Sequence, residues 1–152
     1  MASKIIERAW RAPMATVWTL WTTADGFASW YGPPGFDVEV RAFEAKADGP
    51  LHYTMRAVSP AMVSRMEQSG QPIVRSVDAT FTEVEPMTVV AFAEPFGPKS
   101  MHTRARFEVR DDQVHLTLEI EAPTEDWVRG AAMGWEGALS KLGLRLEELP
   151  AG

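Results

Sequence analysis

The chain has 152 residues and no cysteine; 45% of its residues are hydrophobic, 24% are charged, and the formal net charge is −6. This length fits one domain with a core of its own, so we expect residues 1–152 to form a single domain. A negative chain without a basic run is a poor partner for nucleic acid, whose phosphates require clustered Lys and Arg. The lack of cysteine excludes disulfides, thiolate nucleophiles and cysteine-ligated zinc.

The N-terminal residues 1–11 do not have the apolar core of a secretion signal, because Lys4, Glu7, Arg8 and Arg11 are spread through them. No segment of the sequence approaches the roughly 20 consecutive apolar residues that a membrane-spanning helix requires. We therefore expect a cytoplasmic protein with no membrane span.

The first part of the chain predicts a strand followed by two short helices. Residues 3–11 alternate weakly between apolar and polar side chains, as a strand does. Pro13 suits the first position of a helix, and the apolar spacing after it predicts a helix over 14–22. Thr23 is a suitable N-cap for a second short helix, and the Gly-Pro-Pro-Gly run at 32–35 ends that helix.

From Phe36 onward the apolar residues recur at every second position, which predicts strands. The segment 59–72 is the longest connection; it can form one or two helical turns that carry Met62, Val63 and Met66. Long connections in compact domains are often lids or binding loops. The expected strands are 36–41, 51–57, 73–84, 88–93, 101–109 and 114–120, with a break at 95–98.

The last two expected strands indicate how the sheet is covered. Apolar residues alternate with polar and charged ones in both strands, so one face is apolar and the other faces water. On the wet face we expect Arg104 and Arg106 to oppose Glu119 and Glu121. The pattern therefore predicts an antiparallel sheet with a single covered side.

The segment after Thr124 carries one continuous apolar stripe at alternating steps of 4 and 3 residues, which predicts one long α-helix. A lone long helix must cover something, and the only available partner is the sheet. The stripe consists of Val128, Ala132, Trp135, Leu139, Leu142, Leu146 and Leu149.

The same helix contains four glycines, each of which costs roughly 1 kcal/mol relative to alanine in a helix interior. We interpret them as positions of close backbone approach, or of space, beneath the helix. These glycines are Gly130, Gly134, Gly137 and Gly143.

Short strings along nearly the whole chain, from about residue 5 to 149, carry a resemblance to a known family. They are Arg11-Ala12-Pro13, Val17-Trp18, Trp30-Tyr31-Gly32-Pro33, Asp48-Gly49, Gly134-Trp135, and Leu139 with Leu142. Their order resembles the START-like (SRPBCC) superfamily, and within it the branch named after the activator of Hsp90 ATPase (AHSA1). The resemblance implies an α+β helix-grip fold: a curved antiparallel β-sheet wrapped around a long C-terminal helix, with two short helices after the first strand. The longer 59–72 segment, and the single Gly49 in a turn that is usually glycine-rich, depart from the family pattern.

The resemblance also implies a cavity between the sheet and the helix that holds an apolar ligand. Family members include lipid, sterol and hormone carriers, polyketide cyclases and many stand-alone bacterial domains, and the fold does not decide among them. Aromatic and methionine side chains are typical of such a cavity, although they also fill ordinary cores. Tyr53 and Trp135 can in addition donate hydrogen bonds to a ligand. The expected ligand-binding residues are Trp30, Tyr31, Phe36, Tyr53, Met55, Met66, Phe81, Phe92, Met101, Trp127 and Trp135.

Other site chemistries find little support in the sequence. His52, His102 and His115 fall with the polar set on three different expected strands, so we expect them to be exposed and expect no metal site. No serine lies in a Gly-x-Ser-x-Gly setting, and the Gly-Pro-Pro-Gly run has prolines where a phosphate-binding loop needs backbone amides. We therefore expect no cofactor.

Two alternatives to ligand binding stay open. Glu83 and Glu94 lie near strand ends beside aromatic residues, where a half-buried carboxyl can act as an acid or base in a cyclase or hydrolase. The branch name suggests, as the second alternative, a module that regulates the chaperone ATPase Hsp90. We favour a binding protein for a small apolar molecule over both an enzyme and a chaperone regulator. A homodimer also stays open, because nothing in the sequence identifies an interface.

Overall fold

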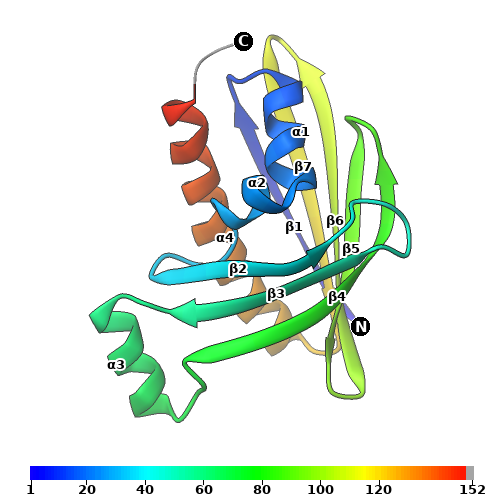
Figure 1. Ribbon diagram of the computed structural model, residues 1–152. Coiled ribbons are helices and arrows are strands. Elements are labelled where there is room, and N and C mark those ends of the chain that lie inside the picture. Colours follow the sequence, from blue (N-terminus) through cyan, green and yellow to red (C-terminus); the bar gives the residue numbers. More distant parts are fainter. Residues whose placement is uncertain (150–152) are drawn as a thin grey trace.

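The computed structural model describes residues 1–149, in which a seven-stranded antiparallel sheet curves around one long helix (Figure 1). The strand order is β1-β7-β6-β5-β4-β3-β2, so β1 and β2 are the edges. This is the α+β helix-grip architecture that the sequence predicts. The elements in chain order are β1 (Ala2–Trp10), α1 (Met14–Thr22), α2 (Ala24–Ala28), β2 (Phe36–Phe43), β3 (Pro50–Ala57), α3 (Pro60–Ser69), β4 (Val74–Glu85), β5 (Val89–Phe96), β6 (Lys99–Arg110), β7 (Gln113–Ala122) and α4 (Glu125–Glu148).

The long helix α4 packs its apolar stripe onto the concave face of the sheet (Figure 1). It begins at a capped end, where the side chain of Thr124 accepts a hydrogen bond from the backbone N–H of Trp127 at 3.2 Å. Leu139 and Leu142 are almost completely buried, and each such side chain stabilises the fold by about 1.5–3 kcal/mol. The stripe is confirmed: Val128, Ala132, Trp135, Leu139 and Leu142 are buried, and Leu146 and Leu149 are partly buried.

None of the helices within residues 1–149 combines the length and the apolar character needed to cross a membrane.

Two bulges bend the half of the sheet that carries the cavity. The ladder between β2 and β3 shifts register around Arg41, and the ladder between β4 and β5 shifts around Thr82. An extra residue in one strand increases the local twist and bends the strand. The guanidinium group of Arg41 also donates hydrogen bonds to the carbonyl oxygens of Tyr53 and Val77, at 3.1 and 3.0 Å, which ties β2 to β3 and β4.

Strand β5 continues through Pro95, although the sequence predicts a break at 95–98. Proline removes a backbone N–H, which a central strand normally needs for its ladder. The ladder with β4 begins only at the pair of Ala93 with Thr80, so Pro95 lies beyond it and pairs on the β6 side alone, opposite Ser100. The missing donor therefore costs no ladder bond with β4.

One of the two expected charge pairs on the outer face of the hairpin formed by β6 and β7 is confirmed. Arg104 opposes Glu119 as predicted. Arg106 instead opposes Thr117, and Glu121 opposes His102, so the second predicted pair is wrong. The strands begin their pairing at Arg110 and Gln113, across a two-residue turn, and this turn sets the register.

The segment 59–72 forms the helix α3, which is longer than the one or two turns expected. Ser59 caps it by accepting a hydrogen bond from the N–H of Met62 at 3.2 Å, and Gly70 ends it with a left-handed φ of 72°. None of its residues is buried. Figure 1 shows α3 at the ends of β3 and β4, where it projects away from the body of the sheet.

The four glycines of α4 have different surroundings. A Cβ added at Gly137 would lie under 3.0 Å from Cδ of Pro34, so this glycine permits close approach of the loop after α2. Gly134 faces Pro33 at an ordinary contact distance of 3.7 Å, whereas a Cβ at Gly130 would meet nothing within 4 Å. The expectation of close approach is therefore confirmed at Gly137, whereas Gly130 is exposed to solvent and does not border a space beneath the helix.

We expect Gly137→Ala to destabilise the protein and Gly130→Ala to stabilise it. Helix propensity favours alanine by roughly 1 kcal/mol at both positions. At 137 the rigid ring of Pro34 must move, and overpacking of this kind costs about 1–3 kcal/mol. Urea denaturation of the two variants measures both free energies of unfolding. Equal stabilisation by both substitutions would show that the loop does not rest on Gly137.

Candidate functional site

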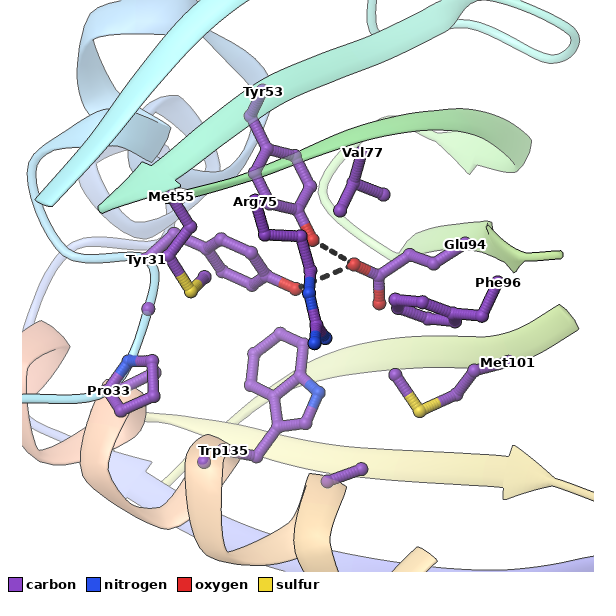
Figure 2. Close-up of a pocket in the computed structure, with 14 residues that line it drawn as sticks. Tyr31, Pro33, Tyr53, Met55, Arg75, Val77, Glu94, Phe96, Met101 and Trp135 are labelled. Carbon is purple, nitrogen blue, oxygen red and sulfur yellow. Dashed lines mark hydrogen bonds between the residues drawn. The ribbon is translucent and has the colours of Figure 1, made fainter. Parts of the chain in front are cut away.

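A cavity of about 160 Å³ lies between the concave face of the sheet and α4 (Figure 2). Its floor comes from strands β3 to β6, one wall comes from α4, and the loop after α2 closes one side. The wall is mainly apolar, with a few polar groups set into it. The lining residues are Tyr31, Gly32, Pro33, Tyr53, Met55, Arg75, Val77, Glu94, Phe96, Met101, Ala131, Gly134, Trp135 and Ala138.

Strand alternation directs the side chains of the floor into the cavity. On β5, Val90 and Phe92 are buried against the core, and Glu94 follows in the same register with only 2% of its surface exposed. On β4, the buried Val77 precedes the buried Ala79 on the same face. The sheet therefore places a carboxyl group on a face that is mainly apolar.

Two tyrosine hydroxyls hold one oxygen of the Glu94 carboxyl group (Figure 2). Tyr53 donates a hydrogen bond to Oε2, and Tyr31 donates to the same atom at 3.4 Å. The other oxygen, Oε1, is buried and has no hydrogen-bond partner among residues 1–149. An unsatisfied buried polar atom costs about 1–3 kcal/mol, so Oε1 is a position where a ligand group would gain binding energy.

Burial raises the pKa values of the three side chains in this cluster. Desolvation raises the pKa of Glu94 above its ordinary value, and the hydrogen bonds from Tyr53 and Tyr31 offset part of that increase. Burial, followed by the charge of Glu94, raises the pKa of both tyrosine hydroxyls well above the usual range. Both tyrosines are therefore neutral hydrogen-bond donors at neutral pH.

The loop after α2 is fixed to α4, which holds Tyr31 in place. The ammonium group of Lys141 donates to the carbonyl oxygen of Gly32 at 3.2 Å and to that of Tyr31 at 3.5 Å. The ring of Pro34 packs on Gly137 from the same side. Tyr31 also packs edge-on against Trp135, with 5.3 Å between the ring centroids. Helix and loop thus form one continuous wall.

The structure brings five of the expected ligand-binding residues to the cavity and places the other six elsewhere. Trp30 is fully buried in the core, where its indole N–H donates to the carbonyl oxygen of Leu20 at 2.7 Å. Met66 lies on α3, and Trp127 packs on Phe96 at the outer end of the site. Those that line the cavity are Tyr31, Tyr53, Met55, Met101 and Trp135, and those that do not are Trp30, Phe36, Met66, Phe81, Phe92 and Trp127.

The two carboxylates singled out by the sequence have different positions. Glu94 lies in the cavity, and it is buried rather than half-buried. Glu83 lies on the outer face of the sheet, where its carboxylate accepts a hydrogen bond from Arg104 at 2.9 Å. The interpretation of Glu83 as a cavity acid is therefore wrong, because a bulge between Phe81 and Glu83 keeps it out of the inward-facing register.

Sequence reasoning missed Arg75 as a cavity residue. The sequence of β4 nevertheless indicates its position. Arg75 belongs to the same alternate set of residues as Val77, Ala79 and Phe81, which all face inward. Its side chain is exposed at the mouth of the cavity, and Cζ lies 5.9 Å from the ring centroid of Phe96. Arg75 could have been identified as a cationic residue at a strand position where the alternation predicts an inward-facing side chain.

The histidines are less exposed than predicted. His102 is exposed, but His52 and His115 are only partly exposed, and Nε2 of His115 is buried without a hydrogen-bond partner within residues 1–149. Nowhere in residues 1–149 do three or more His, Cys, Asp or Glu side chains gather in a way that could hold a metal ion.

One family model matches most of the chain. It is described as "Activator of Hsp90 ATPase homolog 1-like protein", and it matches residues 11–147. A comparison with curated proteins gives no match.

Several solved structures of bacterial proteins are similar to this chain over nearly its whole length. A protein from Chromobacterium violaceum is 19% identical with a TM-score of 0.78, and the match covers 95% of this chain and 96% of that one. The AHSA1 protein of Silicibacter pomeroyi is 18% identical with a TM-score of 0.76, covering 96% and 98%. A protein from Staphylococcus epidermidis is 20% identical with a TM-score of 0.76, covering 99% and 93%. At these identities the likeness shows a shared fold and no more.

Proposed function

Because the chain belongs to the family of activator of Hsp90 ATPase homolog 1-like proteins, whose fold binds ligands, we propose that it binds a small, largely apolar molecule between the sheet and α4. The site is the cavity of about 160 Å³ that Tyr53, Glu94 and Trp135 line. A cavity of about 150 Å³ in another protein holds benzene, so this volume suits a guest with one ring or a comparable chain.

The buried carboxyl group of Glu94 is the observation that carries this proposal. Placing an ionisable group in an apolar interior is costly unless its hydrogen-bonding capacity is used. Tyr31 and Tyr53 use only Oε2, and Oε1 is left without a partner among residues 1–149. A ligand hydroxyl or carbonyl group at this position supplies the missing hydrogen bond. A core built only for stability gains nothing from this arrangement.

Thermal unfolding with 4-methylphenol tests the proposal, because this probe combines one apolar ring with one hydroxyl group. At a probe concentration about ten times its dissociation constant, we expect the melting temperature to rise by about 3–5 °C. No rise at millimolar probe would contradict a cavity that accepts such a guest.

A cavity-filling substitution makes the test specific for this site. Ala131 lines the cavity from α4, and we expect Ala131→Leu to weaken binding of 4-methylphenol by at least about tenfold, because the larger side chain occupies the guest's volume. Met133→Leu is the matched control, since Met133 is 73% exposed on the same helix. Unchanged binding by Ala131→Leu, or equal loss in both variants, would place the bound probe elsewhere.

A second candidate function is acid–base catalysis by Glu94. Burial raises the pKa of the Glu94 carboxyl group, and such a group can act as a proton donor or acceptor for a bound substrate. Glu94→Gln separates the two functions: an enzyme loses turnover while it keeps its ligand, and a carrier has no turnover to lose. Regulation of a chaperone ATPase ranks below both, because docking on a partner gives no role to the buried Glu94. Stimulation of Hsp90 ATPase activity on mixing would reverse this order.

A further inference from the structure

We infer that Arg75 and Glu94 together select the ligand: a small apolar carboxylate, whose carboxylate group binds Arg75 at the mouth and whose other end presents a hydroxyl group to Glu94. This inference rests on the proposed function and adds the chemical class and the orientation of the guest. It follows from the positions of the one cationic side chain and the one carboxyl group in the cavity lining, Arg75 on β4 and Glu94 on β5.

The guanidinium group of Arg75 is available to a ligand. Figure 2 shows the side chain reaching over the cavity rather than away from it. Within residues 1–149, none of the ion pairs or side-chain hydrogen bonds involves Arg75. Its guanidinium carbon instead lies over the ring of Phe96, 5.9 Å from the ring centroid. An arginine over a ring uses its flat face, so the N–H groups at its edge stay free for a carboxylate.

The position of Arg75 in the strand supports a binding role. Inward-facing positions of β4 hold Val77, Ala79 and Phe81, all buried, and Arg75 continues the same face at its exposed end, beside the cavity. A cation here draws an anion to an otherwise apolar opening. Arginine matches the planar, two-oxygen geometry of a carboxylate.

Glu94 fixes the orientation of the guest. An anionic group placed beside this buried carboxyl would be repelled when the carboxyl is ionised and would lose its hydration without a countercharge. The hydroxyl groups of Tyr31 and Tyr53 are already directed at Oε2. A neutral hydroxyl group can instead donate to Oε1 or accept from it, whichever protonation state Glu94 has. The anion therefore lies at Arg75, and the neutral polar group lies at Glu94.

Three one-ring probes test this assignment by isothermal titration calorimetry. They are 3-(4-hydroxyphenyl)propanoate, its neutral amide, and 3-phenylpropanoate, which lacks the hydroxyl group. We expect the hydroxylated acid to bind up to about fivefold more tightly than the amide, as one ion pair at an exposed side chain provides. We also expect it to bind more tightly than 3-phenylpropanoate by a similar factor, because one buried hydrogen bond is lost.

Arg75→Gln and its control assign the effect to this side chain. We expect Arg75→Gln to bind acid and amide equally. The acid loses up to about fivefold in affinity, and the affinity for the amide does not change. Arg56→Gln removes an exposed arginine from the neighbouring strand β3, outside the cavity lining, and keeps the wild-type preference. Melting temperatures of both variants near that of the wild type show that the fold is intact.

The outcomes separate this inference from the proposed function. Equal binding of acid and amide by the wild-type protein overturns the inference and leaves the proposed function standing. An acid preference that survives in Arg75→Gln, or that Arg56→Gln also loses, overturns the role of Arg75. If neither acid nor amide binds while 4-methylphenol still stabilises the protein, the ligand class is wrong. If none of these probes binds, both proposals fail.

Discussion

Trp135→Ala is expected to lower the free energy of unfolding by about 3–5 kcal/mol, because it empties the centre of the aromatic core. The indole of Trp135 is only 4% exposed. It stacks on Trp21 with 5.8 Å between the ring centroids and an interplanar angle of 8°, and it packs edge-on against Tyr31. Each such aromatic pair adds about 0.5–1.5 kcal/mol beyond the area that it buries. Urea denaturation at neutral pH measures the change.

Trp127→Ala is the matched control for this prediction. Trp127 lies on the same helix but is only partly buried, and among the ring–ring contacts of residues 1–149 it takes part in one, with Phe96 at 5.6 Å. We expect it to cost clearly less than Trp135→Ala. Trp135→Phe keeps a ring in the core but removes the indole N–H from the cavity wall, and therefore separates packing from hydrogen bonding to a ligand. Equal losses for the two alanine variants would contradict a core centred on Trp135.

The second large effect is the pH dependence of stability that Glu94 introduces. Burial raises the pKa of Glu94 above its ordinary value of 4.5, so the folded protein binds this proton more tightly than the unfolded chain. The stabilisation by this proton is fully present below pH 4.5 and is lost as the pH rises through the folded-state pKa. In that window the free energy of unfolding falls by up to about 1.4 kcal/mol per pH unit for one group.

Glu94→Gln removes this titration and keeps the shape of the side chain. The groups that face Glu94 are the hydroxyls of Tyr31 and Tyr53, which stay neutral in this range, and Arg75 at the mouth. The difference in unfolding free energy between wild type and variant is therefore expected to fall with rising pH from about 4.5 upward. Denaturation curves between pH 4 and pH 8 give this difference. Glu83→Gln, on the outer face of the sheet, controls for the removal of one carboxylate.

The fold could be predicted largely from spacing. The stripe at alternating steps of 4 and 3 residues in α4, and the alternation in the paired strands β6 and β7, each depend on one local periodicity. The errors occur where a neighbouring strand or turn, and not the local pattern, determines the structure. Pro95 fits inside β5 because the ladder with β4 ends before it, and Arg106 misses Glu121 because the turn sets the register.

The candidate site could be predicted only in part. Phe92 and Met101 both face the concave side of the sheet, yet only Met101 borders the cavity. Alternation predicts on which face of the sheet a side chain lies. It does not predict which side chains on that face α4 leaves uncovered. Trp30 lies in the turn after α2, outside any strand, so alternation does not assign it to a face, and its side chain is completely buried in the core. Glu94 and Arg75 are easier to predict as site residues, because each is a charged residue at an inward-facing position of a strand.

Methyl NMR of methionine-labelled protein tests the central claim most directly, because two methionines, Met55 and Met101, line the cavity. On titration with 4-methylphenol, we expect the methyl resonances of Met55 and Met101 to shift and saturate together. The exposed Met87 and Met133 are internal references and should not move. If the resonances of Met55 and Met101 stay unchanged at saturating probe, or move no more than those of Met87 and Met133, the space beneath α4 does not receive a guest.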